Sequence, residues 1–229
     1  MKRFLAVLLS LILAAGSLFV AAFAADGKKE KVYPVILLQG YSGPKLFNQD
    51  TGEKAWGLDF DKVKEHVLND YGKELANGAK EYAKGNPDPL VDTLGTMLLD
   101  VMDPIACNAD GSSKYNLDTF PKGAEATRMS TLIANGQEEY IGEKPIMTGF
   151  VEKLTQQGVE NAADYIFIYT NDWRKGQAQY AKDIDAYIDE VRALTGSDKV
   201  DIYGLSFGGQ CGASYLYYYG EKAKVHKAC

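Results

Sequence analysis

The chain has 229 residues, of which 46% are hydrophobic and 24% are charged, with 23 glycines and 7 prolines. These proportions are those of an ordinary globular protein, and they exclude a disordered chain, a collagen-like repeat and a coiled coil. The formal net charge of −6 argues against nucleic acid as a partner, because a surface that binds nucleic acid is basic. Two histidines and three cysteines are too few for a His/Cys metal site or a disulfide framework, so neither a metal nor another cofactor is expected.

The first 24 residues have the pattern of a cleaved signal peptide. Lys2 and Arg3 give a positive start, residues 4–20 are almost unbroken apolar sequence, and small residues at 22 and 24 suit the cleavage site. The alternative is an uncleaved membrane anchor, because the run approaches the roughly 18 apolar residues that span a bilayer. We therefore expect residues 25–229 to be secreted or extracytoplasmic, with membrane anchoring left open.

The first element expected after the leader is a short buried strand. Residues 35–38 are apolar and begin with β-branched side chains, and residues 39–44 form a loop rich in glycine. The following stretch, 45–145, is less regular. It contains a helical pattern over residues 61–77 and a second apolar segment over residues 90–101.

The pattern becomes regular from residue 145 onward. Helices are predicted over 146–154, 181–194 and 207–219, and strands rich in β-forming residues over 165–169 and 199–203. Alternation of strands and helices is typical of a mainly parallel sheet joined by right-handed crossovers. The predicted fold class is therefore α/β, with helices on both faces of the sheet.

One motif points to chemistry. Gly204-Leu205-Ser206-Phe207-Gly208 fits the GxSxG pattern and falls between a predicted strand and a predicted helix, which is the context of a nucleophile elbow. A strand that turns into a helix within a few residues forces a strained conformation on the serine and leaves no room for a Cβ on either side. Ser206 is thus the candidate nucleophile; the alternative is a tight turn with an incidental serine.

An oxyanion hole requires two donors. The backbone N–H of Phe207 would be one, and the loop after the first strand, at Gly40 and Tyr41, would supply the other. The alternative for Gly40 is a turn glycine without a catalytic role.

The chain resembles the lecithin:cholesterol acyltransferase-like branch of the α/β-hydrolases. The likeness rests on the strand and glycine at 35–40, on the strand that ends in Tyr169-Thr170-Asn171-Asp172-Trp173-Arg174, and on the Ser206 elbow. It covers residues 32–43 and 146–228. The resemblance implies that 25–229 is a partial α/β-hydrolase domain in which 45–145 corresponds to the variable lid or cap-like insertion.

The Asp-Trp-Arg triplet is the more diagnostic part of the resemblance. Asp172 and Arg174 are expected to hold their loop through an ion pair, and Trp173 to be a core or pocket-wall aromatic. Two positions depart from the family. Leu205 stands where a histidine is common, and Phe207 is bulkier than the residue many relatives carry.

The triad of such an enzyme cannot be completed from the sequence after Ser206. In this fold the acid and the histidine follow the serine, and the remaining residues offer only Glu221 and His226. A helix over 207–219 would carry the chain roughly 20 Å from the elbow, so His226 is expected to be a partly exposed strand residue. We hypothesise that the chain is the N-terminal part of a longer enzyme; His66 is interpreted as a residue on a solvated helix face.

The three cysteines have separate interpretations. Cys211 falls inside the predicted apolar helix after the elbow and is expected to be a buried core thiol. Cys107 lies in a loop, where it could pair or be free, and Cys229 has no evident role.

Three functions remain open from the sequence. The leading one is an exported serine esterase, lipase or O-acyltransferase that forms an acyl-enzyme on Ser206, with lipid or other acyl esters as substrates. The second is a non-catalytic binding protein that retains the fold, and the third is a polysaccharide acyl esterase, for which the 15 tyrosines would suit stacking on sugars. Peripheral contact with a membrane is also left open, because residues 45–145 could contain a lid.

Overall fold

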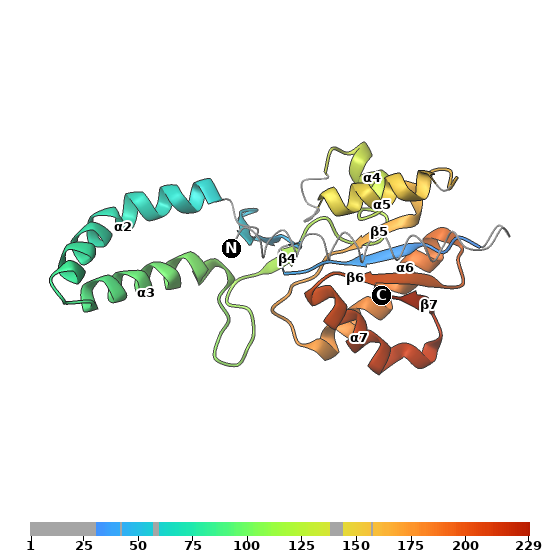
Figure 1. Ribbon diagram of the computed structural model, residues 1–229. Helices are drawn as coiled ribbons and strands as arrows, with labels where there is room; N and C mark the ends of the chain where they lie inside the picture. Colours follow the sequence, from blue (N-terminus) through green and yellow to red (C-terminus); the bar gives the residue numbers. More distant parts are fainter. Residues whose placement is uncertain (1–30, 42, 57–59, 138–143, 157) are drawn as a thin grey trace. The chain divides into compact units, whose positions relative to one another are not determined.

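The computed structural model describes residues 31–41, 43–56, 60–137, 144–156 and 158–229 (Figure 1). The chain divides into two compact units. Unit 1 comprises the chain up to Pro44 and again from Pro121 to Cys229, and unit 2 is Lys45–Phe120. Unit 2 is therefore one continuous segment inserted between two parts of unit 1. The signal peptide expected over residues 1–24 lies outside the described residues.

Unit 1 is built on a four-stranded parallel sheet. Its strands, in the spatial order β5-β1-β6-β7, are Ile166–Tyr169, Val35–Leu38, Val200–Gly204 and Val225–Ala228. Leu38 at the end of β1 pairs with Tyr169 at the end of β5 and with Gly204 at the end of β6. The carboxyl ends of these three strands are thus level. The parallel α/β sheet predicted from the sequence is confirmed.

Helices cover both faces of this sheet (Figure 1). They are α4 and α5 on one face and α6 and α7 on the other, with bounds Met129–Ala134, Lys144–Gln156, Gln177–Thr195 and Phe207–Tyr219. Short 3-10 turns, η3 (Ala162–Tyr165) and η4 (Gly220–Lys222), precede β5 and β7. Because side chains alternate along a strand, Ile36 and Leu38 of β1 pack toward α6 and α7, whereas Val35 and Leu37 pack toward α4 and α5.

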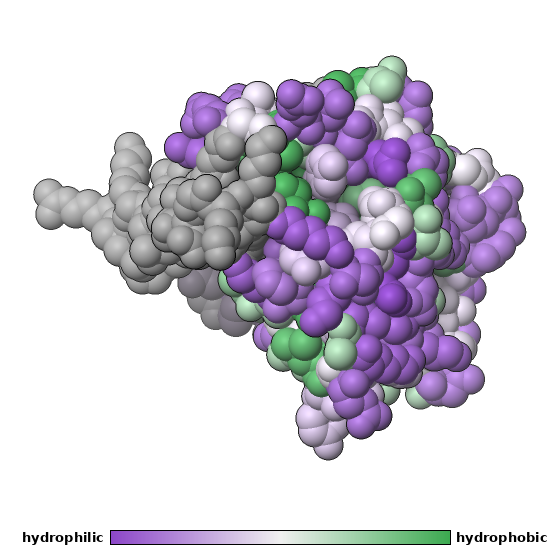
Figure 2. Space-filling view, turned by 90° about the vertical axis from the view of Figure 1, so that its right-hand side faces the viewer, coloured by the Kyte–Doolittle hydropathy of each residue, from purple (hydrophilic) through white to green (hydrophobic). Residues whose placement is uncertain are grey.

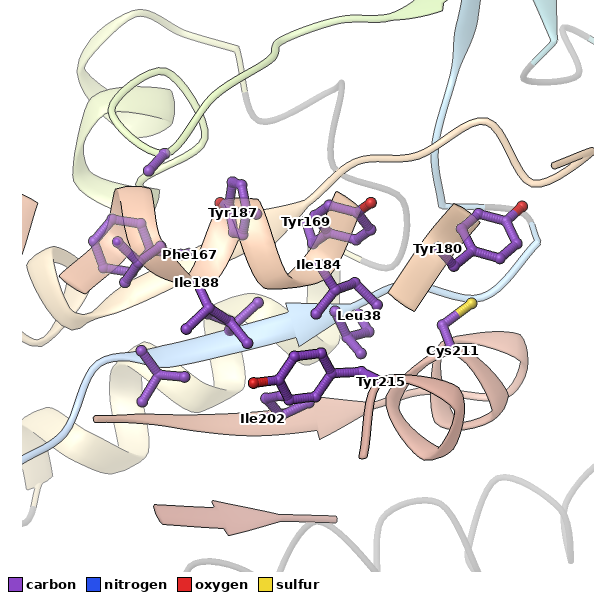
Figure 3. Close-up of a cluster of buried hydrophobic side chains, with 14 of the residues drawn as sticks. Leu38, Phe167, Tyr169, Tyr180, Ile184, Tyr187, Ile188, Ile202, Cys211 and Tyr215 are labelled. Atoms are coloured by element: carbon purple, nitrogen blue, oxygen red, sulfur yellow. The ribbon is translucent and has the colours of Figure 1, made fainter. Parts of the chain in front are cut away.

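The larger core lies between the sheet and the helices α6 and α7 (Figure 3). In α6, Ile184, Ile188 and Val191 recur at helical spacing and are fully buried, as an amphipathic helix on a sheet requires. Cys211 of α7 is buried in the same cluster, where burial raises the pKa of its thiol to about 11. The prediction of a buried core thiol is confirmed.

The tyrosines of α7 divide between the core and the surface. Tyr215 is buried and stacks on Tyr219, with ring centroids 6.2 Å apart. Tyr217 and Tyr218 are exposed and contact each other edge to face. Packing against the sheet therefore accounts for only part of this run of aromatic residues.

Unit 2 combines a small antiparallel sheet with a helical hairpin. The sheet has the order β3-β2-β4, with strands Lys54–Trp56, Leu46–Asn48 and Leu117–Thr119, and the helices are α2 (Phe60–Ala83), α3 (Asp88–Met102) and the short η1 (Asp103–Ile105). The two helices approach each other closely near their connection: a Cβ on Gly78 of α2 would lie 2.8 Å from the Cα of Leu90 of α3. His66 in α2 bonds Asp70 and Asp100 with its two ring nitrogens, at 2.6 and 2.8 Å. His66 therefore connects the two helices. Its interpretation as a residue on a solvated helix face did not include this contact with α3.

Residues 121–134, which follow unit 2, belong to unit 1 and pack on its sheet. The sequence pattern had placed them in the insertion over 45–145. Met129 and Leu132 of α4 are buried against β1 and β5. The N–H of Ile168 also donates to the carbonyl oxygen of Thr127 at 3.0 Å. These contacts explain why unit 2 ends at Phe120 rather than near residue 145.

The face shown in Figure 2 is mostly hydrophilic, with hydrophobic residues in small separate patches. Among the residues that the structure describes, no helix is long and apolar enough to span a membrane.

A charge cluster fixes the end of unit 1. Asp185 of α6 accepts hydrogen bonds from the Nζ atoms of Lys222 and Lys224, at 2.6 and 2.9 Å, and Lys224 also donates to Asp189 at 2.6 Å. Burial alone would raise the pKa of Asp185, but the two lysines outweigh burial and hold that pKa below its usual value. The cluster therefore ties α6 to the connection that leads into β7.

We expect Asp185→Asn to lower the free energy of unfolding at pH 7 by about 1–2 kcal/mol, because it removes the carboxylate that pairs with both Lys222 and Lys224 in a partly buried site and leaves Lys224 with Asp189 alone. The pKa of Asp185 is lowered in the folded state, so its contribution is present above the pKa of an unfolded aspartate and is lost as the pH falls through the folded value. The difference between wild type and variant in urea denaturation should therefore be largest at pH 7 and shrink as the pH falls below about 4.

Asp183→Asn is the matched control, because Asp183 lies on the same helix in a more exposed position and approaches Lys175 at only 3.8 Å. We expect a loss of less than about 0.5 kcal/mol for this variant. Equal losses for the two variants would contradict the structural role given to Asp185.

Candidate functional site

Ser206 occupies a strained turn between β6 and α7. Its backbone angles are φ 52° and ψ −116°, a region that residues with a Cβ rarely adopt and that costs about 1–3 kcal/mol. Hydrogen bonds on both sides hold the turn: the N–H of Leu205 donates to Leu38 O at 2.9 Å, and that of Gly209 donates to Ser206 O at 3.0 Å. The Ser206 residue itself is exposed. The turn therefore presents a serine in a strained conformation to the surface.

The two glycines of the motif lie where a side chain would collide with the backbone. A Cβ on Gly208 would lie 1.9 Å from the carbonyl oxygen of Leu38, and a Cβ on Gly204 would lie 2.6 Å from the Cα of Gly209. Neither neighbour can move without disrupting the sheet or the helix. The close approach of α7 to the end of β1 is thus the physical reason for glycine at 208, and the close approach of the first turn of α7 to the end of β6 is the reason for glycine at 204.

The sheet order brings the loop after β1 beside this turn. The chain passes from β1 to β5 on one side and later returns to β6 on the other, so the order reverses at β1. Crevices outside the carboxyl ends of strands at such a reversal are where ligands bind in open α/β sheets. Gly40 and Tyr41 follow β1 there, and Ser206 and Phe207 follow β6. The structure therefore places the predicted nucleophile and both predicted donor residues at the same edge of the sheet.

Aromatic side chains surround the turn. The ring of Tyr41 stacks on that of Phe207, with centroids 4.2 Å apart and planes at 20°, and it meets Trp173 edge to face at 5.5 Å. Phe207 is buried and also contacts Tyr180 at 5.4 Å. Trp173 is half-buried and packs against the core below α6 and α7. The residue that follows Ser206 is therefore packed between two aromatic rings, those of Tyr41 and Tyr180.

The Asp-Trp-Arg loop after β5 contains the expected ion pair. Arg174 donates from Nε to Oδ1 of Asp172 at 2.9 Å and from Nη2 to Oδ2 at 2.6 Å, and both side chains are almost fully buried. The hydroxyl of Tyr180 donates to the backbone oxygen of Asp172 at 2.6 Å. A paired geometry of this kind fixes the loop, and Tyr180 links it to the core.

Gln39 was not singled out from the sequence, although it is the last residue before the Gly40 turn. It is 1% exposed, its Nε2 donates weakly to the carbonyl oxygen of Tyr169 at 3.5 Å, and a Cβ on Gly43 would lie 2.5 Å from its own Cβ. Its Oε1 has no hydrogen-bond partner among the residues described. The signal in the sequence was a polar amide directly after an apolar strand, which marks the point where the strand leaves the core.

His226 lies at the other end of the sheet from Ser206. It sits in β7, whose register places Val225 opposite Val200 and Lys227 opposite Asp201, near the start of β6. At about 3.3 Å per residue along β6, this is roughly 16 Å from the serine. The structure therefore agrees with the expectation that His226 is a strand residue and does not reach the elbow.

His226 is held by a buried aspartate. The Nδ1 atom of His226 lies 3.0 Å from Oδ1 of Asp201, and the imidazole ring stacks on the ring of Tyr33 with centroids 4.4 Å apart. Burial raises the pKa of Asp201, and the hydrogen bond from His226 opposes that rise in part. No pattern in the sequence indicates this pair, because the two residues meet only through the register of β6 and β7. Glu221, the other residue considered for a triad, lies in η4 after α7.

Comparison with protein-family models, with curated proteins and with solved structures finds no match for this chain.

We expect Gly208→Ala to destabilise the protein by about 3 kcal/mol or more, because its Cβ would overlap the end of β1 and no flexible side chain can give way. Gly209→Ala is the matched control: the adjacent Cβ would lie at an ordinary 3.6 Å from the nearest atom, and alanine is the better helix former by about 1 kcal/mol. Urea denaturation of both variants tests the expectation. A tolerated Gly208→Ala would contradict the close approach of α7 to β1.

Ser206→Gly should raise the free energy of unfolding by about 1–2 kcal/mol, because glycine adopts the observed φ without the strain that a Cβ imposes. Ser214→Gly, the same substitution inside α7, should instead lower it by about 0.5–1 kcal/mol. Thermal unfolding of the two variants gives the comparison. A loss of stability in Ser206→Gly equal to that in Ser214→Gly would refute strain at the turn.

Proposed function

We propose that this chain is a serine hydrolase or acyltransferase of the α/β-hydrolase type, with Ser206 as its nucleophile and lipid or other acyl esters as its substrates. The observation that carries the proposal is the conformation of Ser206, which is strained, exposed and flanked by two glycines that exclude a Cβ. A binding protein would gain no evident advantage from a serine held in this way, whereas a nucleophile elbow requires it.

The chemistry assigned to the site is acyl transfer through a covalent intermediate. The Oγ of Ser206 attacks the carbonyl carbon of an ester, and the electron pair of the C=O bond moves onto its oxygen. The backbone N–H groups of Phe207 and of the Gly40–Tyr41 loop would donate to that oxyanion, at the N-terminus of α7, where the helix dipole also favours negative charge. Collapse expels the alcohol and leaves an acyl-serine, which water or a second alcohol then attacks.

The proposal assigns the nucleophile and the donors but no general base. Unit 1 contains one histidine, His226, which is paired with Asp201 at the opposite end of β6. The proton of Ser206 must pass to a base during attack. The residues described beside Ser206 within unit 1 include no histidine for that step.

Two further observations support the lecithin:cholesterol acyltransferase-like branch as the source of this fold. The Ser206 turn follows β6 and the Gly40–Tyr41 loop follows the adjacent strand β1, which is consistent with the arrangement of the nucleophile and the donor loop in α/β-hydrolases. The Asp-Trp-Arg triplet lies at the end of the strand on the other side of β1, with Asp172 and Arg174 in a buried ion pair.

A non-catalytic binding protein that retains the fold is the second candidate. The observation that favours it is the separation of His226 from Ser206, which leaves the serine without a histidine beside it in the described part of unit 1. The two candidates differ in one property, the reactivity of the Ser206 hydroxyl.

A fluorophosphonate probe tests this property directly, because its covalent attachment requires an activated serine. We expect labelling of the wild-type chain at Ser206, located by mass spectrometry of the labelled peptide, and none in Ser206→Ala. Ser214→Ala serves as the control, because it removes another hydroxyl from α7, one that bonds Gln177. Absence of labelling in a wild-type chain shown by circular dichroism to be folded would overturn the proposal in favour of the binding protein.

A further inference from the structure

The residues expected to supply the two oxyanion donors also contact each other through their side chains. Tyr41 follows β1 and Phe207 follows β6, and their rings stack with centroids 4.2 Å apart. A backbone hydrogen bond between the two segments joins Leu205 to Leu38, two residues before Phe207 and three residues before Tyr41. The ring contact therefore connects the two segments beyond this hydrogen bond. It does so at the residues whose N–H groups would donate to the oxyanion.

The two rings differ in how strongly their surroundings restrain them. Phe207 is 5% exposed and is fixed by the core and by the edge of Tyr180, whose hydroxyl is itself bonded to Asp172. Tyr41 is 50% exposed, and its ring contacts Phe207 and Trp173. Phe207 thus acts as a fixed platform, and the stack limits where Tyr41 can lie.

The loop that carries Tyr41 includes Gly40, whose backbone has wide conformational freedom. Among the described residues, the N–H of Gly43 donates to the carbonyl oxygen of Gly40 at 3.1 Å. Donors aimed at a developing charge are effective only when they are already in place, since reorganising them during the reaction costs rate. An external restraint on this loop would therefore act directly on the transition state.

We propose that the stacking of Tyr41 on Phe207 fixes the separation of the two backbone donors, which makes the Tyr41 ring a positioning group for the oxyanion site. This inference rests on the proposed function. It also gives a physical role to the bulky residue after the nucleophile, by which this chain departs from many members of the family it resembles.

The expected effect is smaller than the loss of a donor. An aromatic pair stabilises the contact enough to change the population of a held loop by about two- to tenfold. Removal of a complete oxyanion donor reduces kcat by about 100- to 1000-fold. Loss of the Tyr41 ring should therefore reduce the rate by about two- to tenfold, because the donor is still present but is less often in place.

The first test measures the rate of fluorophosphonate labelling as a function of probe concentration. We expect Tyr41→Ala to lower the maximal labelling rate constant about two- to tenfold with the half-saturating concentration unchanged, and Tyr41→Phe, which keeps the ring, to recover most of that rate. Tyr217→Ala is the control for loss of an exposed aromatic ring, because Tyr217 is 83% exposed and belongs to the far part of α7. A raised half-saturating concentration with an unchanged maximal rate would make Tyr41 a substrate contact and overturn the proposal.

A second pair of variants tests whether Phe207 is the partner. Phe207→Leu keeps an apolar side chain but removes the stack, and a Tyr41→Ala substitution made in that background should have little further effect. Additive effects of the two substitutions on the labelling rate would contradict coupling through the ring contact.

The last measurement does not depend on activity. Amide hydrogen exchange of Gly43 reports the Gly40–Gly43 turn, and we expect it to be about two- to tenfold faster in Tyr41→Ala while the amide of Ile168 in β5 is unchanged. Unchanged exchange at Gly43 would overturn the positioning role, whatever the labelling rate. Absence of labelling in wild type would instead refute the proposed function, and the exchange at Gly43 would still decide whether the rings hold the loop.

Discussion

The close approach of α7 to the carboxyl end of β1 is the constraint from which the rest of the site follows. Gly208 lies so near the carbonyl oxygen of Leu38 that no Cβ can stand between them. The contact draws the first turn of α7 over the end of the sheet, so that the chain must reverse within a few residues after Gly204. That short reversal forces Ser206 into a positive φ, and it leaves the start of the helix beside the loop that follows β1.

The core below this point supplies the rigidity that the turn needs. Tyr180 of α6 is fully buried, contacts Phe207 edge to face and donates its hydroxyl to the backbone of Asp172. One side chain thus connects the helix after β5, the residue after the candidate nucleophile and the loop held by the Asp172–Arg174 ion pair. Burial raises the pKa of Tyr180, so the hydroxyl stays protonated and remains a donor at neutral pH.

The sequence predicted those parts of the structure that depend on local pattern. Alternating strands and amphipathic helices after residue 145 predicted the parallel sheet, and GxSxG between a strand and a helix predicted the tight turn. Contacts between segments that are far apart in the chain produce no local pattern in the sequence from which they could be predicted. The stack of Tyr41 on Phe207, the Asp201–His226 pair and the attachment of the 121–134 segment to β5 depend on register and packing between elements far apart in the chain, which periodicity does not encode.

Strain at Ser206 also bears on the choice between a catalytic and a binding function. A disfavoured φ persists only where the surroundings determine it, and here the bonds from Leu205 to Leu38 and from Gly209 to Ser206 do so. Relaxing the turn would require only a glycine at position 206, a single substitution that would raise stability. A chain that used this surface for binding alone would have no reason to keep the serine, whereas a nucleophile must have a side chain at that position. The cost of the strain is therefore itself an argument for reactivity at Ser206.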